Sequence, residues 1–533
     1  MVLRRVSRRA LLVGGWSVLG VPVLAACLGR KSKGKKGGGS AASGNAGSGS
    51  AGASGGSGQG VTRTVSTVGA TLKVTVGPAV VSNDVMVVPL AAHLDKAGSG
   101  GLSSDGKKFD VHLAWDRNDR FSGADGVRLV DLDAGTVQET FKASSQSTSL
   151  TDKEPDATLH ALFKPVDANT INVLVPESGL FEGVPVVRDG KLSEEAKKAL
   201  ENTYDTESSP DPVALETFTA SVDGASDTRV TGKSVTITLA SDVLFDSDSA
   251  DLSAQADTTL KKAADQLSTY PGGQVTIVGH TDDVADDAHN QDLSQRRAQA
   301  VSDRLGQLAS MSAYSVSVSG KGESEPRVPN DSDENRQLNR RVEITLVPTE
   351  STSTKSDAGK DPSGKGGGDL PKAEGPVAKG SEGVTVKRGG GDDKLTFVLK
   401  EVTRRGKYLV GEVKATGGPG GTDVGPADWL QPTQLAGSAR GEEDTKLLGA
   451  ITGLSLLTAQ TRYYPVDYTT AKGAHHPLSE ITADNKLGDG DATTLTVVWP
   501  DTGQDTVTLD LEPATGPTRP NNPFRLTDIP VRK

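Results

Sequence analysis

Two residues of opposite charge flank a predicted strand-to-helix corner near the middle of the chain. Asp282 follows residues 275–278, a run rich in β-branched side chains that predicts a buried strand. Arg297 stands beside residues 298–308, where apolar side chains recur at helical spacing, so we expect it near the start of a helix. A carboxylate accepts hydrogen bonds from an ammonium group, and a guanidinium beside a helix N-terminus holds a carboxylate. The corner therefore suits a ligand that carries both groups on one carbon, the free end of an amino acid.

The surrounding sequence predicts a sheet and helices that would hold this corner. Residues 234–239 alternate apolar and polar side chains, as a half-buried strand does, and residues 256–267 repeat apolar side chains at helical spacing. Further strands are predicted at 315–319 and 341–347. The order β-α-β-α-β-β predicts an α+β domain in which helices cover one face of a small mixed sheet. Residues 320–329 are expected to form the loop that returns the chain to the last strand.

Short motifs in this segment, taken in order over about 231–348, resemble one known family, the OmpA-like peptidoglycan-binding domains. The motifs are Val243-Leu244-Phe245-Asp246, Gly279-His280-Thr281-Asp282, the helical run from Asn290 through Leu293, Ser294 and Arg297 to Ala298, Gly320-Lys321-Gly322-Glu323, and Asn339-Arg340-Arg341-Val342.

This resemblance implies a site for the diaminopimelate end of a peptidoglycan stem peptide. The Asp of the turn, here Asp282, would take the amine, and the Arg of the helix, here Arg297, would take the carboxylate. Thr281 and Asn290 would line the same pocket. Many members carry Gly three residues after the Asp, where this chain has Ala285 in an acidic loop. A positive φ there would be costly for Ala, and the extra carboxylates would repel an acidic ligand group.

Other candidate residues are expected to be structural. We expect the pair Arg340 and Arg341 to place one side chain across the domain and one in solvent, and His280 to be a turn residue. The acidic loop lacks the spacing and closing Glu of a calcium loop. His112 and His160 lie on predicted strands without further ligands at metal spacing. No metal and no cofactor are therefore expected.

Residues 1–27 read as an export signal. A basic start precedes the apolar residues 10–23, and small residues then lead to Cys27, in a pattern that resembles a bacterial lipobox. We expect Cys27, the one cysteine of the chain, to be lipidated, with an uncleaved anchor or an accidental cysteine as the alternative. Residues 7–12 resemble a twin-arginine signal, and general secretion is the alternative route. The protein is then expected on the outer side of the cell membrane, held there by lipid.

The remaining length is expected to divide into β-rich domains and linkers. Short strands punctuated by Gly, Asp and Ser predict a β-sandwich on each side of the α+β domain, and two segments of the second echo the first, which suggests a duplicated immunoglobulin-like fold. The expected order is 1–27 signal, 28–60 Gly/Ser-rich flexible tether, 61–190 β-sandwich, 191–230 connector, 231–349 OmpA-like domain, 350–383 disordered linker and 384–533 second β-sandwich.

These features predict a lipid-anchored envelope protein that binds peptidoglycan non-covalently and links membrane to wall, with an unknown protein partner for the β domains. One alternative is an envelope interaction or scaffold protein whose OmpA-like domain has lost wall binding through Ala285 and the acidic loop. Another is a secreted cell-wall hydrolase, but outside the Gly/Ser-rich tether the sequence contains no Gly-x-Ser-x-Gly elbow, and the 533 residues contain no His-Glu-x-x-His and no second cysteine, so we expect no enzyme. The net charge of −11 argues against nucleic acid as a partner.

Overall fold

The structure is a computed structural model of the whole chain, which divides into two units, Met1–Ser50 and Ala51–Lys533. The predicted signal, Cys27, most of the tether and His112 lie outside the described residues. No helix among the described residues is both long enough and apolar enough to cross a membrane. The structure describes residues 59–67, 69–98, 109–111, 124, 126–141, 148–201, 211–349, 369–387, 392–422, 425–430, 451–470, 473, 475–479, 486–513 and 522–533.

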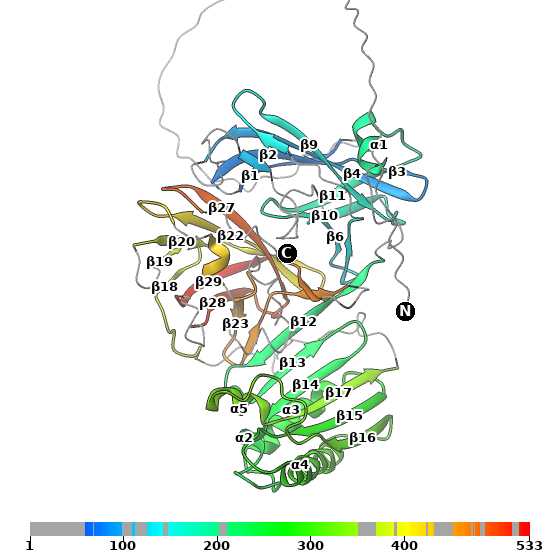
Figure 1. Cartoon of the computed structure of the whole chain (residues 1–533), viewed down its shortest axis with the longest axis vertical. Helices are drawn as coiled ribbons and strands as arrows, with labels where there is room; N and C mark the ends of the chain where they lie inside the picture. Colours follow the sequence, from blue (N-terminus) through cyan, green and yellow to red (C-terminus); the bar gives the residue numbers. More distant parts are fainter. Residues whose placement is uncertain are drawn as a thin grey trace, which may run out of the picture. The chain divides into compact units, whose positions relative to one another are not determined.

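The molecule is mostly β, with few helices, and the helices of the central domain lie beside one mixed sheet (Figure 1). In that sheet β15 and β16 run parallel, while the other neighbouring pairs are antiparallel. The strands follow the spatial order β12 (Val213–Ser221), β13 (Ser226–Val230), β14 (Val235–Ala240), β17 (Arg341–Pro348), β15 (Gly273–His280) and β16 (Tyr314–Gly320). The helices are α2 (Ser241–Leu244), α3 (Ala256–Leu267), α4 (Asp287–Leu308) and α5 (Asp333–Asn339).

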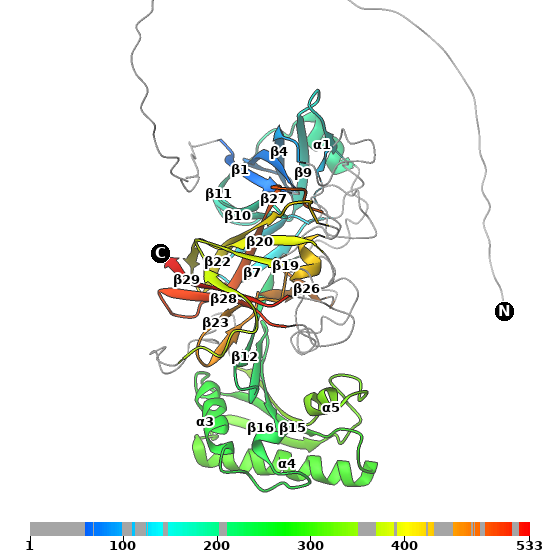
Figure 2. The same ribbon diagram turned by 90° about the vertical axis from the view of Figure 1, so that its left-hand side faces the viewer.

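The core of the central domain follows from two periodicities. Every second residue of β15, Val275 and Ile277 among them, is buried toward the helices, and α4 buries Ala298, Val301 and Leu305 at helical spacing. Helix α4 packs on β15 and β16, and α3 packs beside α4 (Figure 2). The predicted α+β arrangement with a mixed sheet is therefore present.

Two glycines let α4 approach the sheet closely. Gly279 and Gly320 are register partners on the parallel strands β15 and β16. A Cβ at Gly279 would collide with the backbone oxygen of Ser294, and a Cβ at Gly320 would collide with the backbone nitrogen of Gln295. Both clashes involve the backbone of α4. The helix that carries Arg297 can therefore pack this close to the sheet only if both strand positions are glycine.

The central domain differs from the prediction in three places. Helix α5 forms at Asp333–Asn339, between the expected loop at 320–329 and β17, where no helix was predicted. Ser332 caps this helix by accepting from the backbone N–H of Asn335. Strands β12 and β13 extend the sheet through residues expected to form a connector. Helix α4 begins at Asp287, so Arg297 lies ten residues into the helix rather than near its start.

The first β-rich region pairs most of its strands in two sheets joined by β11, which pairs antiparallel with β10 and then parallel with β3, while β5 and β8 form a separate antiparallel pair. One sheet follows the order β1-β2-β4-β9, and β6 pairs with β10 in the other. The elements are β1 (Val61–Thr67), β2 (Ala70–Val76), β3 (Ala79–Ser82), β4 (Val85–Lys96), β5 (Phe109–Val111), β6 (Arg128–Asp131), β7 (Thr136–Glu139), β8 (Thr148–Leu150), β9 (Asp156–Phe163), β10 (Thr170–Val175), β11 (Gly179–Arg188) and α1 (Glu194–Glu201).

Most strands of the last region repeat this pairing. Its ladder follows β19-β20-β22-β27, β23 pairs with β28, and β29 pairs antiparallel with β28 and then parallel with β21. The elements are β18 (Val377–Lys379), β19 (Val384–Lys387), β20 (Lys394–Val398), β21 (Val402–Arg405), β22 (Tyr408–Gly417), η2 (Pro426–Trp429), β23 (Leu454–Leu457), β24 (Thr461–Tyr463), β25 (Asp467–Thr469), β26 (His475–Pro477), β27 (Ala492–Pro500), β28 (Thr506–Leu511) and β29 (Phe524–Arg532).

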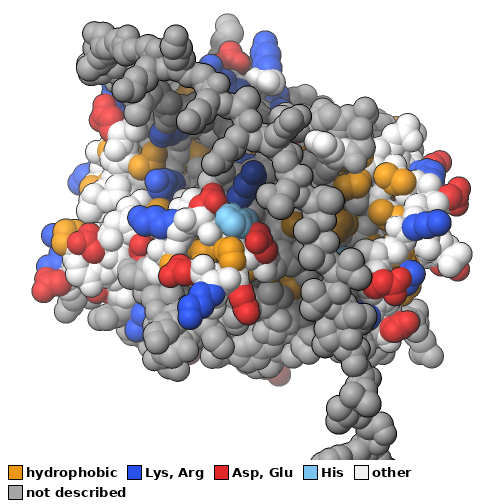
Figure 3. All heavy atoms as spheres, turned by 90° about the horizontal axis from the view of Figure 1, so that it is seen from above, with side chains coloured by type: hydrophobic (Ala, Val, Ile, Leu, Met, Phe, Trp, Pro, Cys, Tyr) orange, Lys and Arg blue, Asp and Glu red, His pale blue; other side chains and the backbone are white. Residues whose placement is uncertain are grey.

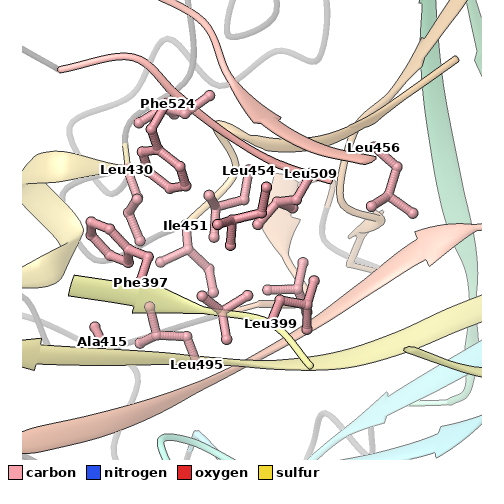
Figure 4. Packing of buried hydrophobic residues seen from close by; sticks show 14 of the residues in the cluster. Phe397, Leu399, Ala415, Leu430, Ile451, Leu454, Leu456, Leu495, Leu509 and Phe524 are labelled. Carbon is pink, nitrogen blue, oxygen red and sulfur yellow. The ribbon is translucent and has the colours of Figure 1, made fainter. Parts of the chain in front are cut away.

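Even the irregularities correspond between the two β regions. The register shifts between Ile171 and Val173 in the β10–β11 ladder, and between Val507 and Leu509 in the β28–β29 ladder. The tail core packs Phe397 against Phe524 as stacked rings with centroids 4.8 Å apart, beside Leu430 and Ile451 (Figure 4). The common ladder order supports the predicted repeat, while an immunoglobulin-like identity stays a prediction.

The expected disordered linker is shorter than predicted at its C-terminal end. Residues 377–379 form β18, which pairs parallel with β29, and Arg525 N–H donates to the carbonyl of Pro376. These contacts order the segment because an edge of the tail sheet was available to it.

Acidic and basic side chains are interspersed on the face of the molecule drawn in Figure 3. The described part of that face therefore presents no broad field of one sign.

We expect Gly279→Ala to destabilise the protein, because the added methyl group forces α4 away from β15. The free energy of unfolding should fall by about 1 to 3 kcal/mol, as overpacking does. The measurement is urea denaturation followed by far-ultraviolet circular dichroism. Gly306→Ala is the matched control, since this exposed glycine of α4 has open space around it and should gain up to about 1 kcal/mol from helix propensity. Equal melting of Gly279→Ala and the parent protein would contradict the packing argument.

Candidate functional site

Asp282 lies two residues after the end of β15, at the corner that the sequence predicts. Its side chain is mostly buried and its carboxylate is occupied on both oxygens. Oδ2 accepts from Nη1 of Arg340 at 2.6 Å, and Oδ1 accepts from the backbone N–H of Val284 at 3.3 Å. The carboxylate therefore has a fixed direction, set by one guanidinium and its own turn.

Arg340 is a member of this site that sequence reasoning placed elsewhere. Its guanidinium also donates to both carboxylate oxygens of Asp242, from Nε at 2.8 Å and from Nη2 at 2.7 Å. The hydrogen bonds to Asp242 contribute most to raising the pKa of Arg340 above its ordinary value, and the hydrogen bond to Asp282 adds to this effect. Arg341 is buried and pairs with Glu343 at 2.7 Å. The expectation that one of the two arginines faces solvent was therefore wrong, because Arg340 pairs with Asp242 and Asp282 while Arg341 pairs with Glu343.

Arg297 is buried with 4% of its surface exposed, and backbone oxygens hold it. Nε donates to the carbonyl of Ser249 at 2.8 Å and Nη2 donates to the carbonyl of Asp246 at 3.3 Å. The guanidinium lies over the ring of Phe245, 5.2 Å from its centroid. Burial lowers the pKa of Arg297, with the nearby charges of Asp242 and Arg340 acting in opposite directions. Among the described residues no carboxylate lies within ion-pair distance of it.

A buried guanidinium without an ion pair is a receptive group for an anion. Leaving a charge in an apolar site without a counter-charge is unfavourable, so an incoming carboxylate would gain both hydrogen bonds and charge neutralisation. The helix dipole adds little, because it is strongest in the first turn and Arg297 lies in the middle of α4. Any attraction for a ligand carboxylate would therefore come from the guanidinium of Arg297 and not, as predicted, from the N-terminus of the helix.

Asn290 and Thr281 stand beside these groups and have different roles in the fold. Asn290 Nδ2 donates to the carbonyls of Asp282 and Ala285, both at 3.2 Å, and to Glu323 Oε2 at 2.6 Å. Asn290 therefore ties the acidic loop to the first turn of α4. Thr281 is buried, and its hydroxyl has no hydrogen-bond partner among the described residues.

The acidic loop is better neutralised than its composition suggests. Asp286 caps α4 by accepting from the backbone N–H of His289 at 3.0 Å, and Asp283 pairs with Arg336 at 2.8 Å. Ala285 is not among the residues with positive φ, so the expected backbone penalty at that position does not arise. Because Asp286 and Asp283 already have these partners, the loop should repel an acidic ligand group less than its composition predicts.

His280 lies outside this group. It is the last residue of β15, buried, and neither ring nitrogen has a hydrogen-bond partner among the described residues. Burial, and after it the charge of Arg341, lowers the pKa of His280 to about 4. The imidazole is therefore neutral at physiological pH and acts as a packed structural residue, at the end of a strand rather than in the turn that the sequence predicts.

Asp282, Arg340 and Asp242 thus form one chain of ion pairs in the structure. Arg297 lies close enough for their charges to affect its pKa. Sequence reasoning missed Asp242, although it directly precedes the Val-Leu-Phe-Asp motif. It also missed the carbonyls of Asp246 and Ser249, because a backbone acceptor leaves no residue-type signal. A hydrogen bond between Asp282 and Arg297 is absent from the described contacts.

The lowered pKa of His280 predicts a pH-dependent stability. The unfolded chain takes up a proton near pH 6.5 and the folded chain does so only near pH 4. The stabilisation is therefore complete above about pH 6.5 and is lost as the pH falls toward 4, by an amount on the order of 3 kcal/mol. Urea denaturation at neutral pH and at about pH 5 measures it.

His280→Gln should show a smaller loss over this interval than the parent protein. His289→Gln serves as the control, since His289 is exposed and pairs with Asp248 at 2.6 Å. A His280→Gln protein whose stability falls with acid as steeply as the parent's would refute the assignment.

Known proteins match the central segment. The model of the OmpA family matches residues 244–340. Outer membrane porin F of Pseudomonas aeruginosa is 42% identical over 105 residues, which cover 20% of this chain and 30% of the porin. The probable lipoprotein YiaD of Escherichia coli is 36% identical over 125 residues, which cover 24% of this chain and 56% of that protein. The chain thus spans less than a third of the length of the porin and little more than half the length of YiaD.

A solved structure of the cell wall anchor of the T6SS from Pseudomonas aeruginosa is 33% identical over 23% of this chain and 88% of that chain, with a TM-score of 0.21. The predicted family is confirmed by the family model together with the two curated relatives, which match over a similar length of chain. Residues 244–340 of this chain therefore form an OmpA-family domain.

Proposed function

We propose that the central domain binds peptidoglycan non-covalently and links the membrane to the cell wall. The main support for the proposal is the guanidinium of Arg297, which is buried and has no ion-pair partner among the described residues. It could bind an anion at the same corner where Asp282 supplies a carboxylate. Membership of the OmpA family supports the wall as the partner. The ligand group is the free amino-acid end of a diaminopimelate stem peptide, whose carboxylate goes to Arg297 and whose ammonium goes to Asp282.

The ammonium must share Asp282 with Arg340. Because Arg340 also makes two hydrogen bonds to Asp242, it stays neutralised when Asp282 turns part of its charge to the ligand. Asn290 keeps the acidic loop in place during this exchange, and Thr281 offers the ligand an unpaired hydroxyl. The four residues of the proposed site are therefore Asp282, Arg297, Thr281 and Asn290.

The same ion pair favours one competing function. Arg340 already neutralises Asp282 at 2.6 Å, which is the arrangement expected if the domain has become an envelope scaffold without wall binding. The two functions differ in one observable property, the retention of the protein on isolated cell wall.

The other segments give this function its place in the cell. We propose that Cys27 carries lipid after export, by the twin-arginine route, and that residues 28–60 form a tether to the outer side of the membrane. The two β domains, which share one ladder order, would be immunoglobulin-like sandwiches that present a surface to a protein partner.

Arg297→Met should weaken binding to purified diaminopimelate-type peptidoglycan at least about tenfold, since it removes a charge-assisted contact to the ligand carboxylate. Asp282→Asn should do the same through the ammonium. The measurement is co-sedimentation of the protein with insoluble peptidoglycan over a range of wall concentrations.

Neighbouring residues provide matched controls. Arg296→Met removes an exposed guanidinium one residue away that pairs with Asp292, and Asp283→Asn removes a carboxylate that pairs with Arg336. Both controls should bind like the parent protein. A parent protein that stays in the supernatant points to the scaffold function, and equal binding by all variants rejects the proposed residues.

Cys27→Ser should release the protein from the membrane fraction and abolish incorporation of labelled palmitate, because a serine cannot form the thioether of a lipoprotein. Fractionation of cells that express either form, followed by immunoblotting, checks this. Continued labelling of the Cys27→Ser protein would exclude the lipobox reading, and this outcome is independent of wall binding.

A further inference from the structure

Three potential metal ligands converge where β12 meets the hairpin of β25 and β26. Glu216 of β12 and Asp467 of β25 are direct register partners on antiparallel strands. His475 of β26 reaches the same place, with Nε2 2.7 Å from Oδ2 of Asp467. One ligand atom from each residue lies within 4.8 Å of the other two. We call these residues the Glu216–Asp467–His475 cluster.

Two carboxylates facing each other in a buried position repel one another. Glu216 and Asp467 are both buried, at 5% and 2% exposure, and like charges directly opposite on paired strands are destabilising. Arg229 offsets part of this charge, donating to Glu216 from Nε at 3.2 Å and from Nη2 at 2.6 Å. Both bonds fall on Oε2, so they do not use Oε1 of Glu216. A second positive charge placed among the three side chains would reduce the repulsion further.

We propose that the Glu216–Asp467–His475 cluster binds a divalent transition-metal ion of the zinc type. An imidazole nitrogen with two carboxylate oxygens is a ligand set that zinc uses, at about 2.0 to 2.2 Å, with water as the fourth ligand. Around a tetrahedral ion at these distances the ligand atoms lie about 3.3 to 3.6 Å from one another. The widest separation, at most 4.8 Å, must therefore shorten, and His475 and Asp467, now 2.7 Å apart, must move slightly apart. Calcium and magnesium fit poorly, because they prefer an all-oxygen shell of six or more ligands. His475 is partly exposed, which gives the ion a path from solvent.

The ion would join parts of the chain that are distant in sequence. Strand β12 continues directly into β13 of the central sheet, and β25 and β26 belong to the tail region. A metal bound by Glu216 from one side and by Asp467 and His475 from the other would hold the tail hairpin on the strand that leads to the OmpA-family domain. This site is separate from the proposed wall site, since it shares no residue with it.

Equilibrium dialysis of the purified full-length protein against Zn²⁺ at neutral pH, after treatment with a chelator, tests the proposal. Asp467→Asn and His475→Gln should each lower the zinc affinity at least about tenfold, the smallest effect expected when a residue next to the metal is lost. With Co²⁺ in place of Zn²⁺, the parent protein should show the strong visible absorption of a low-symmetry site, and both variants should lose it.

The exposed pair His289 and Asp248 supplies the control, because its ring nitrogen and carboxylate oxygen are 2.6 Å apart without a third potential ligand beside them among the described residues. His289→Gln should bind zinc like the parent protein. Circular dichroism of the metal-free variants checks folding, and if Asp467→Asn does not fold, His475→Gln decides. Parent binding no tighter than that of His475→Gln, or an equal loss in His289→Gln, would overturn the proposal.

Discussion

The central domain depends on how it compensates the buried guanidinium of Arg297. Burying this charge is unfavourable, and the fold answers with the carbonyls of Ser249 and Asp246 and with the face of Phe245 rather than with a carboxylate. The nearby acids are committed elsewhere, since Asp242 and Asp282 both bind Arg340. The contrast between Arg340, which pairs with carboxylates, and Arg297, which does not, is the basis of the proposed ligand site.

That arrangement in turn rests on glycine. Arg297 reaches the carbonyls of the segment after α2 because α4 lies close to the sheet, and α4 lies close because Gly279 and Gly320 present no Cβ to its backbone. The depth of one helix on one pair of parallel strands therefore sets the position of the charge. The Gly-His-Thr-Asp and Gly-Lys-Gly-Glu motifs thus contribute packing as well as polar groups.

Strand β12 gives the molecule its second constraint. It pairs with β7 of the first β region, with β24 and β25 of the tail region and with β13 of the central sheet. A single extended segment therefore has partners in every folded region, so their stabilities are coupled through its hydrogen bonds. Two polar residues in its middle, Glu216 and Thr217, are buried.

The sequence alone determined the family, the mixed α+β sheet, the corner at Asp282 and the β-rich character of the flanks, because periodicity and motif order are local signals. Tertiary structure decided the partners. Arg340 on Asp282, the carbonyls on Arg297 and the meeting of Glu216 with Asp467 and His475 join residues far apart in the chain. The identical ladder order of the two β regions was also visible only in space, since hydrogen bonds between strands depend on register and not on residue type. Local pattern specifies which element forms, whereas the pairing of charges depends on which elements the packing of the core brings together.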